Sequence, residues 1–146
     1  MKHYTRENFE LTQSVGFHLN RARSGLLMEM DAALRHLDIT AQQMGVLLSL
    51  ARGAASTPLE ISKLLGIDTG LMTRMLDKLE RKDLLQRQRS AEDRRVVHLV
   101  LTDKGRDIAM QLPQIAPDVL NHRLRHFSAE EFADFVRLLR KFTDGA

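Results

Sequence analysis

Residues 57–82 constrain the fold most, because they contain two helix starts separated by one helix stop. The run from Thr57 to Glu60 reads Thr-Pro-Leu-Glu, which supplies a capping hydroxyl, a proline suited to the first helical position and a carboxylate that completes a capping box. Gly66 ends this short helix, and Asp68 can cap a longer one that continues to about Lys82. A short helix, a turn containing glycine and a longer helix predict a helix-turn-helix.

Two short strands are predicted directly after the second of these helices. The first spans residues 84–89 and the second residues 96–101, in which alternate apolar side chains share one face and His98 points the other way. The connection between them, residues 90–95, is polar and charged. Two strands joined by a charged loop, directly after a helix-turn-helix, predict a wing.

Helices are predicted on both sides of this central module. No proline occurs from Phe9 to Leu37, and apolar residues recur there at spacings of three and four, so one long helix is expected. Thr40 can cap a second helix that stops near Gly53.

Two more helices are predicted at the C-terminal end. Thr102 can cap the first, which Pro113 and Pro117 interrupt, so a kink or two separate pieces are expected. The run from Ser128 to Glu131 is a second capping box and opens the last helix. One face of that helix carries Phe132, Phe135, Leu139 and Phe142.

We therefore expect one mainly α-helical domain over residues 1–146 with a small β-hairpin wing. A winged helix-turn-helix (residues 38–102) is flanked by helices (1–37 and 103–146) with more apolar surface than a small wing module can cover. A second copy of the chain is the expected cover, which makes these dimerisation helices. Without cysteine, a membrane-length apolar run or a signal-peptide pattern, the chain is expected to be cytoplasmic and without membrane contact.

The formal net charge of +3 is a mild bias towards polyanions, so the distribution of charge matters more than its sum. A helix in the major groove presents its N-terminal residues to base edges. Arg74 can form two hydrogen bonds with guanine or bind a phosphate; a solvated helix arginine is the alternative interpretation. The candidate base-reading residues are Thr69, Gly70, Thr73 and Arg74.

The hairpin carries the second set of candidates. Its arginines Arg89, Arg94 and Arg95, with Arg87 nearby, suit the narrow and electronegative minor groove. Asp93 would repel phosphate, so we expect it to pair with an arginine and fix the loop. A charged hairpin tip is often only solvated, but its place after a helix-turn-helix favours DNA. The expected phosphate contacts are Ser56, Thr57, Lys63, Lys78, Arg81 and Lys82.

The run Asp93-Arg94-Arg95-Val96-Val97-His98-Leu99-Val100-Leu101-Thr102, followed by Gly105, resembles the wing signature D-x-R-x-x-x-L-x-L-T-x-x-G of the multiple-antibiotic-resistance-regulator (MarR) family. Residues 39–47 resemble the entry to that family's second helix, and residues 72–82 its recognition helix. The resemblance covers essentially the whole chain. Asp83 departs from it, because the family commonly has glycine there; a small stability cost is expected.

The resemblance implies a homodimer that binds palindromic operators in double-stranded DNA and represses transcription until a small ligand releases it. Arg95 would enter the minor groove, Asp93 would hold it in place, and the helix from Thr69 would read the major groove. The two reading heads would lie about one DNA turn, roughly 34 Å, apart.

The resemblance also implies a cleft for aromatic acids between the dimer helices and the reading head. His18, Arg21 and Arg23 are candidate partners for a carboxylate, and Phe17 and Met44 are candidate apolar walls. Surface or packing roles are the alternative for each. A constitutive or architectural DNA-binding protein without a ligand therefore stays open as the second hypothesis.

An enzyme built on this fold is the third hypothesis. It is disfavoured because the sequence contains no P-loop, no G-x-S-x-G and no dinucleotide-binding fingerprint. No cofactor is expected. His122 and His126 lie four residues apart and could share a metal ion, but no further ligand cluster supports a metal site, so none is expected and their role stays open.

Overall fold

The computed structural model describes residues 1–145 and confirms a mainly helical chain with one two-stranded antiparallel hairpin. The elements follow the order predicted from the sequence. They are a 3₁₀ turn (Leu11–Gln13), α1 (Val15–Leu34), a second 3₁₀ turn (Arg35–Leu37), α2 (Ala41–Ala51), α3 (Pro58–Leu65), α4 (Thr69–Arg81), β1 (Leu85–Arg89), β2 (Val97–Leu101), α5 (Asp103–Leu124) and α6 (Ala129–Asp144).

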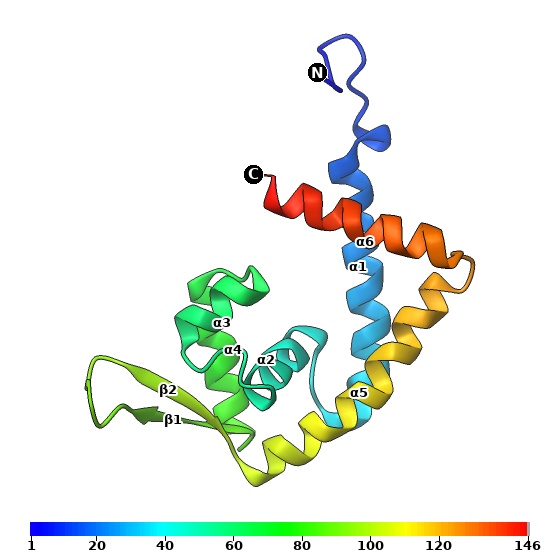
Figure 1. Ribbon diagram of the computed structural model, residues 1–146. Coiled ribbons are helices and arrows are strands. Elements are labelled where there is room, and N and C mark those ends of the chain that lie inside the picture. The colour runs from blue at the N-terminus through cyan, green and yellow to red at the C-terminus, as the bar shows by residue number, and fades with distance from the viewer. Residues whose placement is uncertain (146) are drawn as a thin grey trace.

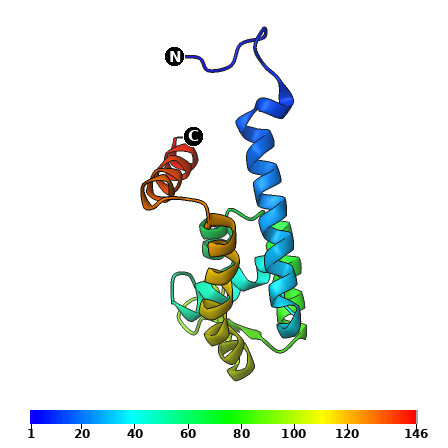
Figure 2. The same cartoon turned by 90° about the vertical axis from the view of Figure 1, so that its right-hand side faces the viewer.

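The elements form a reading head and a stalk (Figures 1 and 2). Helices α2, α3 and α4 and the hairpin gather on one side, while α1 and α5 extend away from them towards α6 and the N-terminal segment. The largest fully buried side chains come from the head and from the places where α1 and α5 meet it. They are Leu34, Val46, Leu47, Ile61, Met72, Leu76, Leu79, Leu84, Leu85 and Leu112.

An ion pair joins the two stalk helices. The guanidinium of Arg123 on α5 donates to both carboxylate oxygens of Glu29 on α1, over 2.8 and 2.9 Å. The guanidinium lies against Gly25 of α1, where an added Cβ would be 2.5 Å from its Nη2 atom. A glycine on α1 therefore leaves room for the cross-link.

Side-chain caps start the helices, as the sequence predicts. The hydroxyl of Thr40 accepts the N–H of Gln43, and that of Thr102 accepts the N–H of Gly105. Full capping boxes occur at the starts of α2 and α6. The capping box predicted for α3 is wrong in one half: Thr57 accepts the N–H of Glu60, but the Glu60 carboxylate accepts the Thr57 hydroxyl instead of its backbone N–H.

The first helix is shorter than predicted at both ends. The buried Ser14 interrupts it, because its side chain donates to the Leu11 carbonyl and accepts the N–H of Phe17, which makes Ser14 the cap of α1. At the other end α1 stops at Leu34, and the chain leaves the following 3₁₀ turn through Asp38 at φ 54°. Both interruptions come from hydrogen bonds and turn geometry that an apolar repeat does not record.

The prolines of α5 do not divide it. One continuous helix includes both Pro113 and Pro117, and Figure 1 shows its axis bending along its length, so of the two expected outcomes the structure has the bend and not the division into two pieces. The two prolines are four residues apart and exposed, so they lie on one solvent-facing side. Carbonyls without a helical N–H partner there can be hydrated, and the helix bends without ending.

Helix α6 begins at its predicted cap but buries none of its residues. Phe135 and Phe142 are 41% and 61% exposed. An open groove of about 820 Å³ lies between this apolar face and the start of α1, lined by Val15, Leu19, Phe135, Leu138, Leu139, Lys141, Phe142 and Gly145. No helix within residues 1–145 combines the length and the apolar character needed to cross a membrane.

Candidate nucleic-acid interface

Helix α4 presents a polar N-terminal turn on a buried base. Its apolar face, with Met72, Met75, Leu76 and Leu79, is buried in the head. Asp68 caps the helix, because its carboxylate accepts the N–H groups of Leu71 and Gly70. The predicted base-reading residues Thr69, Gly70, Thr73 and Arg74 are all exposed. The helix is thus anchored along one face and its first two turns remain open to a ligand.

The cap also affects the charge of this turn. The N–H groups of Leu71 and Gly70, helped by the nearby Arg74 guanidinium, hold the pKa of the Asp68 carboxyl below its ordinary value of 3.8. Asp68 is fully exposed and stays ionised at neutral pH. A negative group at the N-terminus of α4 favours the helix dipole and leaves Arg74 as the cation of this turn.

Gly70 and Thr73 shape the surface of the same turn. A Cβ added to Gly70 would meet only ordinary contacts, the nearest being Asp68 Oδ2 at 3.5 Å, so packing within the chain does not require glycine there. The Thr73 hydroxyl donates to the Thr69 carbonyl over 2.9 Å. Its oxygen can still accept a hydrogen bond, and the absent side chain at position 70 leaves space beside it.

The start of α3 is tied to the wing. Ser56 and Thr57 are half-buried, and the Ser56 carbonyl accepts the N–H of Leu99 over 2.7 Å. The Ser56 hydroxyl lies 3.3 Å from Nδ1 of His98, which points away from the buried face of β2 as predicted. Lys63 is exposed further along α3. The start of α3 therefore holds the hairpin through β2.

The wing is an antiparallel hairpin with an exposed basic tip. Leu85 lies opposite Leu101, and Arg89 lies opposite Val97. Residues 91–95 are exposed, and so is Arg89, so the arginines expected to reach DNA are free of the protein surface. The loop is nevertheless ordered by hydrogen bonds, because the Ser90 hydroxyl accepts the N–H groups of residues 92 and 93.

Asp93 fixes this loop in a different way from the one predicted. Its carboxylate accepts the backbone N–H of Arg95 over 3.0 Å, and its carbonyl accepts the N–H of Val96. The ion pairs found among residues 1–145 do not include Asp93: its partner is an arginine as expected, Arg95, but the contact is made through the Arg95 backbone and not through its guanidinium. The guanidinium of Arg95 is therefore left available while its backbone is held.

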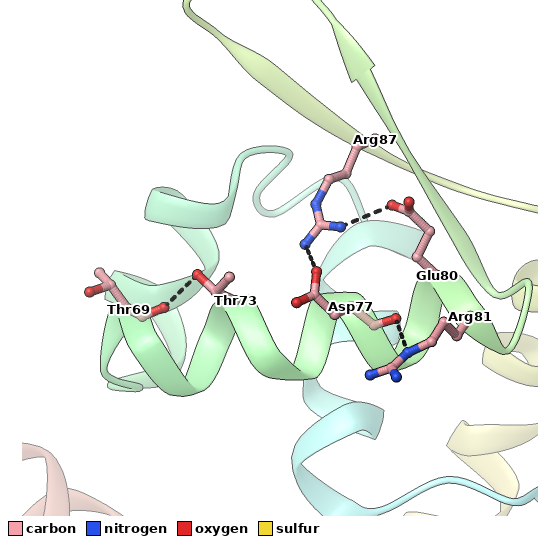
Figure 3. A network of polar contacts seen from close by, with 6 residues as sticks. All are labelled: Thr69, Thr73, Asp77, Glu80, Arg81 and Arg87. Carbon is pink, nitrogen blue, oxygen red and sulfur yellow. Dashed lines mark hydrogen bonds and ion pairs between the residues drawn. The ribbon is translucent and has the colours of Figure 1, made fainter.

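An ion-pair network between the wing and α4 was not predicted. Arg87 of β1 donates through Nη2 to Asp77 over 2.7 Å and through Nη1 to Glu80 over 3.2 Å (Figure 3). Its side chain is 30% exposed, less than either partner. The signal in the sequence was a pair of carboxylates three residues apart on the recognition helix, followed by an arginine on the same strand face as the buried Leu85. Arg87 is thus a structural cation and not a free one.

The other cations at α4 differ in whether they bind groups of the protein. They are Lys78, Arg81 and Lys82. Lys78 is exposed on α4 and open to a phosphate. Arg81 donates to the Asp77 carbonyl, and Lys82 donates to the Asp38 carbonyl and lies 3.7 Å from its carboxylate. Lys82 therefore links the end of α4 to the end of the 3₁₀ turn that precedes α2, which reduces its availability for DNA.

The residues expected to hold a carboxylate ligand lie on two helices. Phe17 is half-buried on α1, its ring packs edge-on against His18, and the Arg21 guanidinium lies 5.7 Å from its centre. Arg23 is exposed on α1, and Met44 is half-buried on α2 against the core. The structure brings the first three together; Arg23 and Met44 stay a prediction for this site.

His122 of α5 and His126, in the turn after α5, do not belong to a cluster of metal ligands. Nε2 of His122 lies 3.3 Å from the Arg125 guanidinium, and His126 lines a separate shallow cavity. Within residues 1–145 no three histidine, cysteine or carboxylate side chains are placed to hold a metal ion.

A helix-turn-helix with an open recognition helix, followed by an arginine-tipped hairpin, defines a winged helix-turn-helix DNA-binding protein. The chain belongs to the MarR family: that family's model matches residues 39–97. The multiple antibiotic resistance protein MarR of Escherichia coli is 38% identical over 124 residues, which cover 84% of each chain.

Solved structures agree with this assignment. A cysteine-to-serine variant of E. coli MarR in complex with operator DNA has a TM-score of 0.78 and 33% identity, covering 88% of this chain and 92% of that one. BpsR of Bordetella bronchiseptica, whose DNA binding is regulated by 6-hydroxynicotinic acid, has a TM-score of 0.83 at 24% identity, covering 93% and 97%; this likeness shows the fold. The chain is thus a DNA-binding transcriptional regulator and not an enzyme.

Proposed function

We propose that the protein is a homodimeric repressor that binds a palindromic operator and is released by a small aromatic acid. The observation that carries the dimer is the apolar face of α6, which has no buried residue although the helix is sixteen residues long. An isolated helix of this length is marginal in water, so its helical state needs a surface to pack on. A second copy offers the same α1–α6 groove in return, as a two-fold interface requires.

The dimer determines how the heads meet DNA. Two copies related by a two-fold axis present two recognition helices and two wings, so their operator is a palindrome with half-sites about one turn apart. Thr69, Gly70, Thr73 and Arg74 would read the major groove, and Arg94 and Arg95 the minor groove. Ser56, Thr57, Lys63, Lys78 and Arg89 would contact phosphates, with Asp93 holding the wing loop.

Light scattering tests the dimer directly. Wild-type protein should run at twice the mass of the chain, and Phe142→Glu should shift it towards monomer and weaken operator binding. Met110→Glu is the matched control, because Met110 is an exposed apolar residue on α5 outside the α1–α6 groove. A wild-type protein that is monomeric at the concentrations used for DNA binding would overturn the proposal.

Selection from a random duplex pool tests the operator. The recovered sequences should share an inverted repeat with half-sites one turn apart, and a promoter carrying that repeat should be silenced by the protein in a transcription assay. Sequences without two-fold symmetry would contradict a dimer that uses both heads. Activation of the same promoter would contradict the repressor assignment.

The ligand proposal rests on Phe17, His18 and Arg21, which place an aromatic face beside a cation on α1. BpsR supports it by analogy, because an aromatic acid regulates its DNA binding. These 146 residues contain no cysteine, so they offer no thiol switch as an alternative. A thermal-shift screen with aromatic carboxylic acids should find a stabilising compound that also releases the operator, and Arg21→Ala should reduce both effects. Failure of every compound in both assays would favour the constitutive regulator.

A further inference from the structure

We propose that Arg87 is a positioning residue for DNA recognition. By bridging Asp77 and Glu80 it holds the hairpin at a set angle to α4, so that the wing arginines and the first turns of α4 meet their grooves together. The inference rests on the proposed contacts of wing and recognition helix with DNA, and adds the group that fixes the two relative to each other.

The hairpin needs such a link because only its inner half is held by the core. Leu85, Leu99 and Leu101 are buried, whereas the chain from Gln88 to Arg95 is largely exposed. A two-stranded ribbon is only marginally stable by itself. Ser56 holds the ribbon on the α3 side, and Arg87 holds it on the α4 side, opposite Leu99 in the register. Within residues 1–145, the side-chain hydrogen bonds between the wing strands and α4 are those of Arg87.

Helix α4 needs the same link for a reason of charge. Thr69, Thr73 and Asp77 follow one another at spacings of four and lie along one side of the helix (Figure 3). Asp77 thus shares a side with the two threonines proposed to read bases, where an unpaired carboxylate repels phosphate. Arg87 neutralises it. Arg87 therefore has two separable effects, screening and positioning, and the test must distinguish them.

Arginine suits this position better than lysine. Its planar guanidinium presents several N–H groups at fixed angles, so Nη1 and Nη2 can reach two carboxylates on successive parts of one helix face. A single ammonium group keeps the charge but gives a less directional link. The difference supplies a conservative variant for the experiment.

The deciding variant combines Arg87→Gln, Asp77→Asn and Glu80→Gln. It removes two negative charges and one positive charge, so the local charge becomes more favourable for DNA while the link is weakened. Binding is measured at one salt concentration on a selected operator duplex of about 30 base pairs, long enough for two half-sites, and on a scrambled duplex. Positioning predicts about tenfold weaker operator binding or more, the scale of one lost base contact, with scrambled-duplex binding unchanged or tighter.

Screening alone predicts the opposite for the operator. A triple variant that binds the operator as tightly as wild type, or more tightly, overturns the proposal. Should the triple variant not fold, Arg87→Lys replaces it, since it keeps the charge: positioning predicts a reduced operator-to-scrambled ratio, and an unchanged ratio overturns it. Circular dichroism establishes folding in each case.

The matched control is Asp134→Asn with Arg137→Gln. This exposed pair has a similar separation of 2.9 Å but lies within α6, away from the reading head, and neither residue lines the α1–α6 groove. It should leave the operator-to-scrambled ratio at its wild-type value; an equal drop in control and triple variant would overturn positioning by Arg87. Wild-type protein that shows no preference for any duplex would overturn both this inference and the proposed operator, whereas loss of the triple-variant effect alone overturns only this inference.

Discussion

The backbone carbonyl of Leu84 occupies the place where a Cβ at position 105 would be: an added Cβ on Gly105 would lie 1.9 Å from that oxygen. The same carbonyl accepts the N–H of Thr102. The end of the wing and the first turn of α5 thus both pack against the backbone of Leu84, the residue that precedes β1. The glycine of the wing signature is required by close packing of backbone on backbone.

Gly105→Ala should therefore destabilise the protein. Because the obstacle is backbone and cannot rotate away, we expect a loss of at least about 1–3 kcal/mol in the free energy of unfolding, measured by urea denaturation. Gly16→Ala is the control: a Cβ there meets nothing within 4 Å, and alanine in α1 should leave stability equal or slightly higher. Equal stability of Gly105→Ala and wild type would contradict the packing argument.

Asp83→Gly should stabilise the protein. Asp83 has φ 59°, a left-handed conformation that glycine adopts without a Cβ penalty, and we expect a gain of about 0.5–1 kcal/mol. Asp38→Gly provides the comparison, because Asp38 has a similar φ of 54° but its carboxylate lies 3.7 Å from the Lys82 ammonium. The gain there should be smaller. A loss of stability in Asp83→Gly would mean that the aspartate side chain does more than tolerate the turn.

Stability should fall in acid partly through Asp68. Hydrogen bonds from Leu71 and Gly70 hold its folded pKa below 3.8, so its contribution is complete above that value and is lost as the pH falls through the lower folded pKa. Asp68→Asn can still cap the helix but does not titrate. Urea unfolding at about pH 5 and about pH 3 should show a smaller acid-induced loss in the variant than in wild type. An equal acid-induced loss of stability in wild type and variant would show that Asp68 does not contribute to the pH dependence.

Arg95→Ala should weaken operator binding and leave the fold intact. The Asp93 carboxylate holds the backbone of Arg95, so truncating the side chain keeps the loop while removing a minor-groove cation. We expect a cost of about 1–3 kcal/mol per half-site in a gel-shift titration at constant salt. Arg137→Ala, with the same charge change on α6, should have little effect. Unchanged affinity of Arg95→Ala would refute the assignment of the wing.

Arg74→Ala should alter sequence preference as well as affinity. The residue is exposed on α4 where a major-groove helix reads bases. Selection with the variant should relax one position in each half-site, since a guanine contact is worth about 1–3 kcal/mol of discrimination. An equal loss on operator and scrambled duplexes would make Arg74 a phosphate contact.

Local signals were sufficient for most of the fold. Each predicted helix start after the first has its capping residue in place, and the glycine at position 66 ends α3 in a left-handed conformation. Caps, apolar spacing and turn residues act over a few positions, so sequence shows them directly. The order of elements followed from these signals.

The errors lie where longer-range or competing contacts decide. Ser14 interrupts the first helix through hydrogen bonds to Leu11 and Phe17, within a stretch whose apolar spacing continues unbroken. Pro113 and Pro117 remain inside α5 because they share its solvent-facing side. The Glu60 carboxylate accepts the hydroxyl of Thr57 and not its backbone N–H, and spacing alone does not distinguish between these two donors.

The sequence predicted which residues are exposed at the site, but it predicted less well which groups those residues contact. The exposed groups of α4 and of the wing tip are where the helix and hairpin patterns placed them. The partners of Asp93 and Arg87 depend on how the loop closes and how the hairpin leans on α4, which spacing alone does not state. Asp93 and Arg87 both help to order the reading surface.

If the chain forms the proposed dimer, helix α6 would make operator occupancy a steep function of the protein concentration in the cell. Because no residue of the helix is fully buried within its own chain, its order and the proposed pairing would form one equilibrium, and dilution would shift that equilibrium towards single chains with one head each. Newly synthesised protein would change from unbound single chains to operator-bound dimers over a narrow range of protein concentration. The sixteen residues of α6, which lie away from the reading head, would then determine how operator occupancy responds to protein concentration.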